Sequence, residues 1–444
     1  MPAFSIENFG CRATDADATG LRGALLADGL TLAKKHASAD IVVLNTCTVT
    51  AAADSQAREA IRKIHRANPA ARIVVTGCYA QRAPEELAAI EGVEWVIGNS
   101  HQARIPEILR RQQSRTASRD FVSVAELEGD ALSLARGPAK ILTADIFAET
   151  EAWTAWAPAA GRAERTRPIL KIQDGCNNRC SYCVIPFVRG RSRSLPPDEV
   201  IREARALCEA GAKEVVLSGI NLGSYGRDLS GRADLAGVVR RILDETALDQ
   251  LRFSSIEPQD VTKDFVALVA STARIARHFH IPLQSGCDGI LRAMHRWYRT
   301  GHYAERVQLI RGMLPDAAIG ADVIAGFPGE TDCDFRTTFE FIERLPVTYL
   351  HVFSFSERPG TAAARLGNRV GAAAIRERAR ALRELGQRKA AEFRAGQAGR
   401  PARALTLAGG GEDYTEALTG NYLKVRIAGR HPANEWHEAR IEAT

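Results

Sequence analysis

Three cysteines in the middle of the chain have the type and spacing of metal ligands. Cys176, Cys180 and Cys183, here called the loop cysteines, form a C-x3-C-x2-C pattern directly after residues 169–173, an expected strand. Three thiolates in one loop suit an iron–sulfur cluster, and a four-iron cluster would keep one iron without a protein ligand. A structural zinc site is the alternative, but it normally takes four protein ligands, and no fourth cysteine or histidine lies nearby in the sequence. The pattern therefore predicts a cluster with an open coordination position.

A second set of three cysteines is scattered through the first part of the chain. Cys11, Cys47 and Cys78, here called the strand-end cysteines, each follow an apolar segment that we expect to be a strand. In a doubly wound sheet the carboxyl ends of adjacent strands line one crevice, so the three thiols should converge there. Any one of them alone is also explained as a small buried hydrophobe. Three cysteines at equivalent strand ends favour a second metal site.

The other cysteines and the start of the chain bear on the compartment. Nine cysteines is an odd number in a long chain, which favours metal binding or catalysis over a disulfide framework. Cys208, Cys287 and Cys333 belong to neither set, and burial or incidental occurrence suffices for them. The start MPAFSIENFGC lacks a secretory layout, and no apolar run reaches the roughly 18 residues that cross a bilayer. We expect a cytoplasmic protein without membrane contact.

Length and charge set bounds on the domains and the partners. A chain of 444 residues exceeds what one compact core usually organises, so two or three domains are expected. Apolar residues make up 45% and charged residues 25%, which excludes wholesale disorder. The net charge of +6 is compatible with a polyanionic partner.

The strand-end cysteines require a domain of alternating strands and helices. Within residues 1–111, apolar runs at 4–9, 40–45 and 72–76 alternate with amphipathic segments. This rhythm is typical of βαβ units and predicts an α/β domain with a doubly wound parallel sheet. Residues 112–165 show no steady period, and we expect an irregular linker there.

The loop cysteines belong to a second alternating series, residues 166–395. Six strands separated by helices predict a partial (β/α)6 barrel of the TIM type, which places its chemistry at the carboxyl ends of the strands. The strands are expected at 169–173, 214–218, 250–256, 278–284, 319–327 and 349–355. An Arg-rich helix at 372–395 then leads to residues 396–444, where β-like runs predict a small β-barrel.

Several strings beyond the cysteines carry a resemblance to a known family. They are KIQDGC at 171–176, IPFVRG at 185–190, SSIEP at 254–258, IPLQSG at 281–286, DVIAGFPGET at 322–331 and RPGT at 358–361. Together with the two cysteine sets, they resemble the radical S-adenosylmethionine (SAM) methylthiotransferases over nearly the whole chain. The tail from 396 resembles TRAM, the RNA-binding β-barrel that ends these enzymes.

The resemblance implies two 4Fe-4S clusters and SAM as cofactors. The loop cysteines would hold the cluster that chelates SAM, and the strand-end cysteines would hold the cluster that carries the sulfur. All six would act as ligands, and no side chain is assigned as an acid or base. The implied reaction adds a methylthio group to an adenosine of tRNA, with an electron donor and a sulfur source of unknown identity. We expect a monomer.

Polar residues at the expected strand ends are candidates for SAM binding. Glu257, Gln284 and Asp322 should face the barrel mouth, where they would contact the amino, ribose or carboxylate groups of SAM. Gly326 would let the adenine edge approach the backbone. The alternatives are that the polar residues support other ligands and that Gly326 serves only a tight turn.

Arginines near the loop and along the path to the tail are candidates for RNA contact. Arg189, Arg191 and Arg193 follow the loop cysteines, and Arg388 and Arg394 lie on the expected long helix. Such residues would contact phosphates in a salt-sensitive manner. The alternative is an ordinary solvated surface, since charged helices are usually exposed.

Strings around the cysteines favour one branch of the family. NTCTVT at 45–50, TGCYAQ at 76–81 and QSGCD at 284–288 look most like the branch that acts on threonylcarbamoyladenosine at position 37 of tRNA. The alternative substrates are isopentenyladenosine 37 and an aspartate of a ribosomal protein. A non-catalytic iron–sulfur protein that binds RNA or senses redox state is the alternative of another class. The absence of a fourth ligand argues against it, because a purely structural site gains nothing from an open position.

Overall fold

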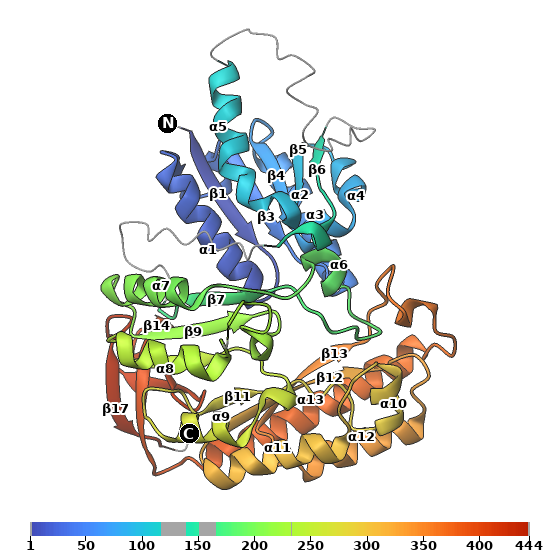
Figure 1. The fold of residues 1–444 in the computed structure, drawn as a ribbon, viewed down its shortest axis with the longest axis vertical. Helices are drawn as coiled ribbons and strands as arrows, with labels where there is room; N and C mark the ends of the chain where they lie inside the picture. Colours follow the sequence, from blue (N-terminus) through green and yellow to red (C-terminus); the bar gives the residue numbers. More distant parts are fainter. Residues whose placement is uncertain (1, 117–138, 151–165, 232, 443–444) are drawn as a thin grey trace.

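The chain folds into three regions that follow one another in sequence. The computed structural model describes residues 2–116, 139–150, 166–231 and 233–442. Figure 1 shows an amino-terminal domain in blue, a larger middle domain in green to orange beneath it, and a carboxy-terminal module in red at the flank. No helix of these residues is both long and apolar enough to cross a membrane.

The amino-terminal domain is built on one six-stranded sheet. Its order is β2-β1-β3-β4-β5-β6, and every pairing is parallel. The strands are β1 (Ala3–Asn8), β2 (Thr31–Leu32), β3 (Ile41–Thr46), β4 (Arg72–Gly77), β5 (Val93–Gly98) and β6 (Lys140–Leu142). The helices are α1 (Arg12–Ala27), α2 (Ala51–Ala67), α3 (Cys78–Arg82), α4 (Pro84–Ala88) and α5 (Ile105–Thr116).

Helices cover both faces of this sheet, and each face has its own apolar core. On β3, Val42 and Leu44 pack with α2, α3 and α4, whereas Ile41 and Val43 pack with α1 and α5. Successive side chains of a strand point to opposite faces, so a strand that is apolar throughout serves two cores. The predicted doubly wound parallel sheet is confirmed.

Part of the expected irregular linker over 112–165 is regular structure, because residues 112–116 complete α5 and Lys140–Leu142 form β6. Strand β6 pairs in parallel with β5 and closes the edge of the amino-terminal sheet. Three residues are too few to show a period in the sequence, and pairing with β5 defines them as a strand. Residues 117–138 and 151–165 of the expected linker lie outside the described residues.

The middle domain is an open barrel made of two sheets. One sheet has the order β10-β9-β7-β8, the other the order β11-β12-β13, and bridges such as Ser255 to His280 connect them. The strands are β7 (Ile169–Asp174), β8 (Arg193–Ser194), β9 (Glu214–Gly219), β10 (Gln250–Phe253), β11 (His278–His280), β12 (Ala318–Ala325) and β13 (Tyr349–Ser354). All pairings are parallel except that of the short edge strand β8 with β7, so the predicted six-strand partial barrel is confirmed with one additional edge strand.

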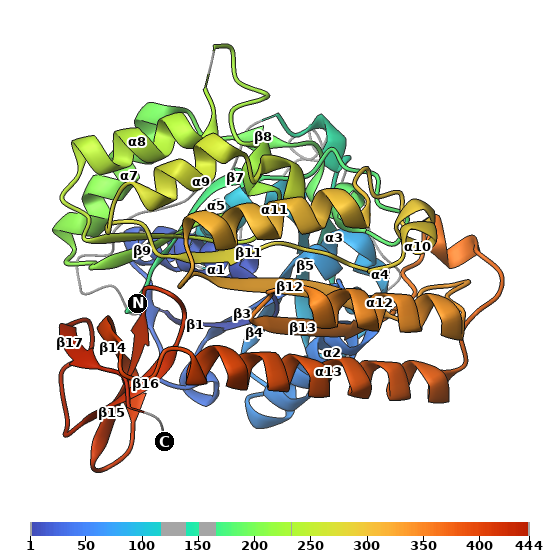
Figure 2. The same cartoon turned by 90° about the horizontal axis from the view of Figure 1, so that it is seen from below.

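Helices cover the outside of the barrel and enclose the largest apolar core. They are α6 (Ile185–Arg189), α7 (Pro197–Glu209), α8 (Leu235–Glu245), α9 (Lys263–Ala270), α10 (Asp288–Ala293), α11 (Thr300–Met313), α12 (Asp332–Arg344) and α13 (Ala372–Ala395). Figure 2 shows the long α13 running alongside β13 toward the carboxy-terminal module. Residues of α7, α8, α9, α11 and α13 share one continuous core with the barrel strands.

The carboxy-terminal module is a curled antiparallel sheet of four strands with the order β16-β15-β14-β17. The strands are β14 (Pro401–Gly410), β15 (Tyr414–Thr419), β16 (Lys424–Ala428) and β17 (Trp436–Arg440). The module is tied to the barrel, because Arg252 of β10 donates to the carbonyls of Thr419 and Gly420, and the indole of Trp436 donates to Asp249. The predicted small β-barrel module is confirmed.

Candidate metal centres and the pocket between them

The loop cysteines lie at the carboxyl end of β7, in a loop that a glycine makes possible. Gly175 has a φ of 67°, and a Cβ there would lie 1.8 Å from the backbone oxygen of Arg191. Only glycine fits such a left-handed, crowded position. The loop returns on itself through a hydrogen bond from the Cys176 amide to the Gly190 carbonyl. The three thiols therefore lie at the end of the barrel where such folds place their chemistry.

Burial makes free thiolates unfavourable in this loop. It raises the pKa of the Cys176 thiol to about 11 and that of Cys183 to about 12, and the neighbouring charge of Cys180 adds to both shifts. Thiolates in such a site need a positive partner, and cluster iron is one that binds thiolate outright. The donor set fits an iron–sulfur cluster.

The structure brings the strand-end cysteines to one edge of the amino-terminal sheet. Cys11 caps α1 after β1, Cys47 follows β3, and Cys78 begins α3 after β4. A Cβ on Gly10 would lie 3.2 Å from the Cys47 sulfur, so the loop before Cys11 packs directly on Cys47. Burial raises the pKa of Cys47 to about 12, with further contributions from the nearby thiols of Cys78 and Cys11.

The spacing within both cysteine sets is wider than zinc requires. In a tetrahedral thiolate site with Zn–S bonds of about 2.3 Å, the sulfurs would be about 3.8 Å apart. Among the described residues, only His280, Asp322 and His351 bring three ligand atoms within 4.8 Å of one another. In each cysteine set the three sulfurs thus do not all lie within 4.8 Å of one another, as expected for ligands that bind different irons of a cluster.

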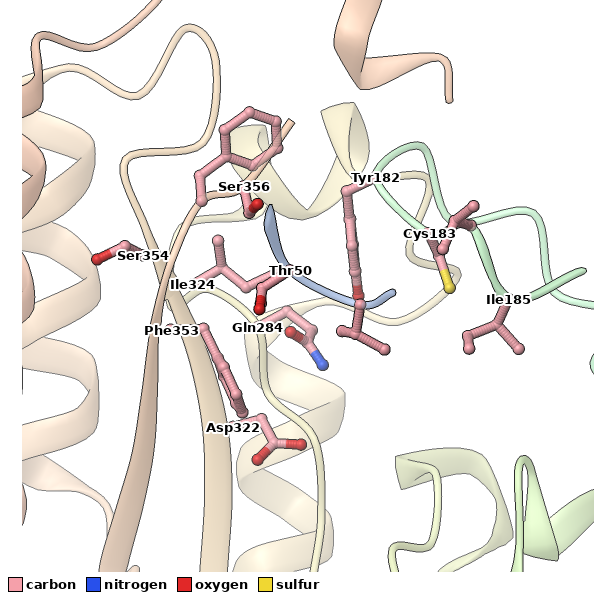
Figure 3. Close-up of a pocket in the computed structure, with 13 residues that line it drawn as sticks. Thr50, Tyr182, Cys183, Ile185, Gln284, Asp322, Ile324, Phe353, Ser354 and Ser356 are labelled. Atoms are coloured by element: carbon pink, nitrogen blue, oxygen red, sulfur yellow. The ribbon is translucent and has the colours of Figure 1, made fainter. Parts of the chain in front are cut away.

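A cavity of about 200 Å³ lies beside the loop cysteines and the segment that follows Cys47. Val49 and Thr50, which follow Cys47, form part of its wall, and Cys183 of the loop forms another part. Figure 3 shows Phe353 and Asp322 on one side of this pocket, with Cys183 and Ile185 on the other. The other lining residues are Tyr182, Val184, Gln284, Ile324, Ser354, Phe355 and Ser356. The cavity is therefore bordered by one loop cysteine and by the segment that follows Cys47.

Two residues predicted to bind SAM, Gln284 and Asp322, line this pocket. Gln284 has a φ of 68°, a conformation that L-residues rarely adopt and that is held here by pairing with Val323. Burial alone would raise the pKa of Asp322, but hydrogen bonds from His280 and His351 hold it well below its usual range. A charged carboxylate and an amide are thus presented to the pocket.

Sequence reasoning missed the two histidines that surround Asp322. His280 Nε2 lies 2.8 Å and His351 Nδ1 lies 3.4 Å from Asp322 Oδ1. These residues come from the neighbouring strands β11, β12 and β13, so only the strand register places them together. The regular alternation along these strands was the available signal, because it points all three side chains to the inner face.

The other two predicted SAM contacts, Glu257 and Gly326, do not line this cavity. Glu257 is ion-paired with Arg296, whose second nitrogen donates to Cys180 Sγ at 3.2 Å. Gly326 lies outside the residues that line the cavity, and a Cβ there would lie 2.4 Å from Ile375 of α13. Its tight turn and close packing account for a glycine at this position.

The prediction that Arg189 and Arg193 contact RNA is wrong, because both side chains are buried. Arg189 is 2% exposed and donates to Cys78, Asp174 and Asp17. Arg193 is 7% exposed and donates to the Arg189 carbonyl at 2.9 Å. The remaining predicted RNA contacts, Arg191, Arg388 and Arg394, are exposed. Packing between the domains, which the local sequence does not show, removes the first two from the surface.

Comparison with known proteins first defines the class. Residues 170–342 match the Radical SAM superfamily, and residues 3–98 match the Uncharacterized protein family UPF0004. The radical SAM methyltransferase TsrM of Kitasatospora setae has a similar fold, with a TM-score of 0.56 and 17% identity over 82% of this chain and 77% of that chain. This is the class of radical SAM enzymes, which implies SAM and a 4Fe-4S cluster as cofactors.

Sequence relatives define the family within this class. The chain is 35% identical to the threonylcarbamoyladenosine tRNA methylthiotransferase MtaB of Aquifex aeolicus over 96% of each chain. It is 34% identical to the tRNA-2-methylthio-N(6)-dimethylallyladenosine synthase of Thermobifida fusca, over 96% of this chain and 82% of the relative. The chain belongs to the radical SAM methylthiotransferase family and is a transferase.

Proposed function

We propose that this protein adds a methylthio group to carbon 2 of threonylcarbamoyladenosine at position 37 of tRNA. The loop cysteines hold one 4Fe-4S cluster and the strand-end cysteines hold a second. The observation that carries the proposal is the cavity bordered by Cys183 of one set and by Val49 and Thr50, next to Cys47 of the other. When bound, the cofactors supply a radical that removes hydrogen from an unreactive carbon and the sulfur that replaces it.

The residues of the pocket orient the reactants and exclude water. Tyr182, Ile324, Phe353 and Phe355 form apolar walls on which an adenine ring can pack. Gln284 contributes an amide that orients SAM or the base. Radical chemistry needs a dry site, because water and side chains otherwise quench reactive species.

The threonylcarbamoyl group is distinguished from an isopentenyl group by its carboxylate, and Arg12 is a suitable partner for it. Arg12 follows Cys11 at the start of α1 and is half-buried. Among the described residues no hydrogen bond or ion pair engages its guanidinium. Burial is the main cause of the lowered pKa of His278, and the positive charge of Arg12 adds a smaller contribution in the same direction. A half-buried guanidinium beside Cys11, with no partner among the described residues, favours an anionic substrate group.

The relatives support the same choice without deciding it. Relatives from Aquifex aeolicus, Bacillus subtilis and Rickettsia prowazekii, 33–37% identical, carry the threonylcarbamoyladenosine name. The dimethylallyladenosine synthase of Thermobifida fusca is about as similar at 34%. The isopentenyl substrate is therefore the second candidate.

The proposed RNA partner would be held by exposed basic residues and by the carboxy-terminal module. Arg191 lies beside the loop cysteines, while Arg388 and Arg394 lie on α13, which leads to the module. An anticodon loop presents unstacked bases beside dense phosphates, which suits pocket recognition combined with salt-sensitive basic contacts.

The test compares matched tRNAs in one assay. The reconstituted, reduced protein is given tRNA that carries either the threonylcarbamoyl or the isopentenyl modification at fixed salt, and nucleoside mass spectrometry scores the methylthio product. We expect product on the threonylcarbamoyl substrate. Preference for the isopentenyl substrate would overturn the substrate assignment, and failure to cleave SAM would overturn the proposed chemistry.

A further inference from the structure

Each cysteine set has a buried arginine that donates to one of its sulfurs. Arg189 Nε lies 3.3 Å from Cys78 Sγ, and Arg296 Nη1 lies 3.2 Å from Cys180 Sγ. The exposed fractions of the two arginines are 2% and 5%. They come from unrelated segments, α6 and the loop between α10 and α11. The same kind of contact is thus made independently at both candidate centres.

Carboxylates hold the Arg189 guanidinium so that its Nε faces sulfur. Nη1 donates to Asp174 at 3.0 Å, and Nη2 donates to Asp17 at 2.7 Å. Lys171 is ion-paired with the same two carboxylates. Because both ends of the planar fork are held, rotation of the side chain would break two buried ion pairs. Cys78 therefore has a fixed donor.

Different partners hold the Arg296 guanidinium, and one of its nitrogens again faces a cysteine sulfur. Nη2 is paired with Glu257, and Nε donates to the Tyr298 hydroxyl at 3.1 Å. That hydroxyl in turn donates to the Pro282 carbonyl at 2.9 Å. The remaining nitrogen, Nη1, is thus aimed at Cys180.

We propose that Arg189 and Arg296 are positioning residues that set the reduction potentials of the two clusters, one arginine for each. This rests on the proposed function, which places a cluster at each cysteine set. Reduction makes a cluster more negative, and a hydrogen bond to a ligand sulfur from a fixed cation stabilises the more negative state. The effect is strong here because both arginines lie in buried surroundings that screen charge weakly.

The test measures the midpoint potentials of both clusters in the full-length reconstituted protein. Paramagnetic resonance follows each cluster during a redox titration, and added SAM marks the signal of the cluster that it chelates. Arg296→Gln should shift only the SAM-sensitive midpoint, and Arg189→Gln only the other, both toward more negative potential. Bound iron, measured in every variant, shows that both clusters are present.

Neighbouring exposed arginines provide matched controls for the loss of one charge. Arg179, within the loop of cysteines, and Arg191, just after α6, are both exposed. Arg179→Gln and Arg191→Gln should shift the midpoints far less than the buried variants do, because water screens exposed charges. If a buried Gln variant does not fold, Arg189→Lys and Arg296→Lys keep the charge but lose the fork, and smaller shifts in the same direction are expected.

Three results would overturn the assignment. The first is that the Gln variants bind as much iron as the wild-type protein and have unchanged midpoint potentials. Where a Gln variant does not fold, the same result in the Lys variant counts. The second is a shift of both midpoints by either single substitution, and the third is an equal shift by the exposed controls. A wild-type protein that binds fewer than two clusters would instead overturn the proposed function.

Discussion

The two cysteine sets, each proposed to hold a cluster, depend on the fold to different degrees. The loop cysteines need only one loop, which is shaped by Gly175 after β7. The strand-end cysteines come from three separate loops and need β1, β3 and β4 in correct register. A loop site is therefore encoded locally, whereas a site of three strand ends exists only when the whole sheet has formed. The exposure of the thiols differs as well. The loop cysteines are all partly buried, whereas among the strand-end cysteines Cys11 is exposed and Cys47 and Cys78 are buried.

Removing the loop set should have the largest effect, because it abolishes both SAM cleavage and methylthio transfer. Replacing Cys176, Cys180 and Cys183 together by Ala should leave about half of the bound iron, since the three ligands form one cooperative site. Iron analysis and detection of 5′-deoxyadenosine measure the two effects. Cys333→Ala, at an exposed cysteine outside both sets, is the control. Unchanged iron in the triple variant would refute the ligand assignment.

Removing the strand-end set should abolish transfer but spare SAM cleavage. In the triple Ala variant of Cys11, Cys47 and Cys78, radical generation requires only the other cluster. Mass analysis of tRNA nucleosides should show no methylthio product, while 5′-deoxyadenosine stays detectable. Cys208→Ala serves as the control because Cys208 belongs to neither set. Full methylthiolation by the triple variant would exclude these cysteines as holders of the sulfur-carrying cluster.

The buried ion pairs between the domains should be the next most sensitive feature. Asp17 of α1 is paired with Lys171 and Arg189 of the barrel, and Asp17→Ala leaves two buried cations short of a partner. We expect a loss of about 3–5 kcal/mol in the free energy of unfolding, measured by urea unfolding followed by circular dichroism.

The matched control for this prediction is Asp28→Ala. Asp28 belongs to the same region but pairs with Arg110, whose side chain is 63% exposed. Water screens such a pair, so its loss should cost at most about 1 kcal/mol. If Asp17→Ala and Asp28→Ala lowered the free energy of unfolding equally, the buried ion pairs between the domains would contribute no more than an exposed pair.

The smallest expected effect concerns substrate choice beside the strand-end site. Arg12→Gln should lower kcat/KM on threonylcarbamoyl tRNA by about 10- to 100-fold. This is the effect expected when one hydrogen bond between charged groups is lost. The isopentenyl substrate lacks the carboxylate, so its low rate should hardly change and provides the internal control. Competition between the two tRNAs, scored by product mass, measures the change. Equal losses on both substrates would assign Arg12 a general role in folding or RNA binding.

Much of the fold follows from local patterns. The helix predicted at 372–395 is found as α13 (Ala372–Ala395), and each expected barrel strand is found, as β7, β9, β10, β11, β12 and β13. Two of them are shorter than expected, since β10 ends at Phe253 and β11 at His280. Hydrophobic period and strand length are properties of short segments, so they are readable without tertiary contacts. The loop cysteines are predictable for the same reason, since their spacing lies within one loop.

The predictions that were wrong or missing concern features that depend on contacts between distant segments. Strand β6 is defined only by its pairing with β5, and Arg189 is buried where Asp17 and Cys78 of the amino-terminal domain meet the barrel. His280 and His351 likewise meet at Asp322 through the register of three strands.

The sequence by itself determined the order of elements, the two cysteine sets and the family, because each rests on period, spacing or a continuous string. Tertiary structure alone decided which charged residues lie in the interior and that His280 and His351 meet at Asp322. Burial and pairing arise from packing of residues far apart in the chain, and a local pattern of charges looks the same whether it will meet water or an opposite charge.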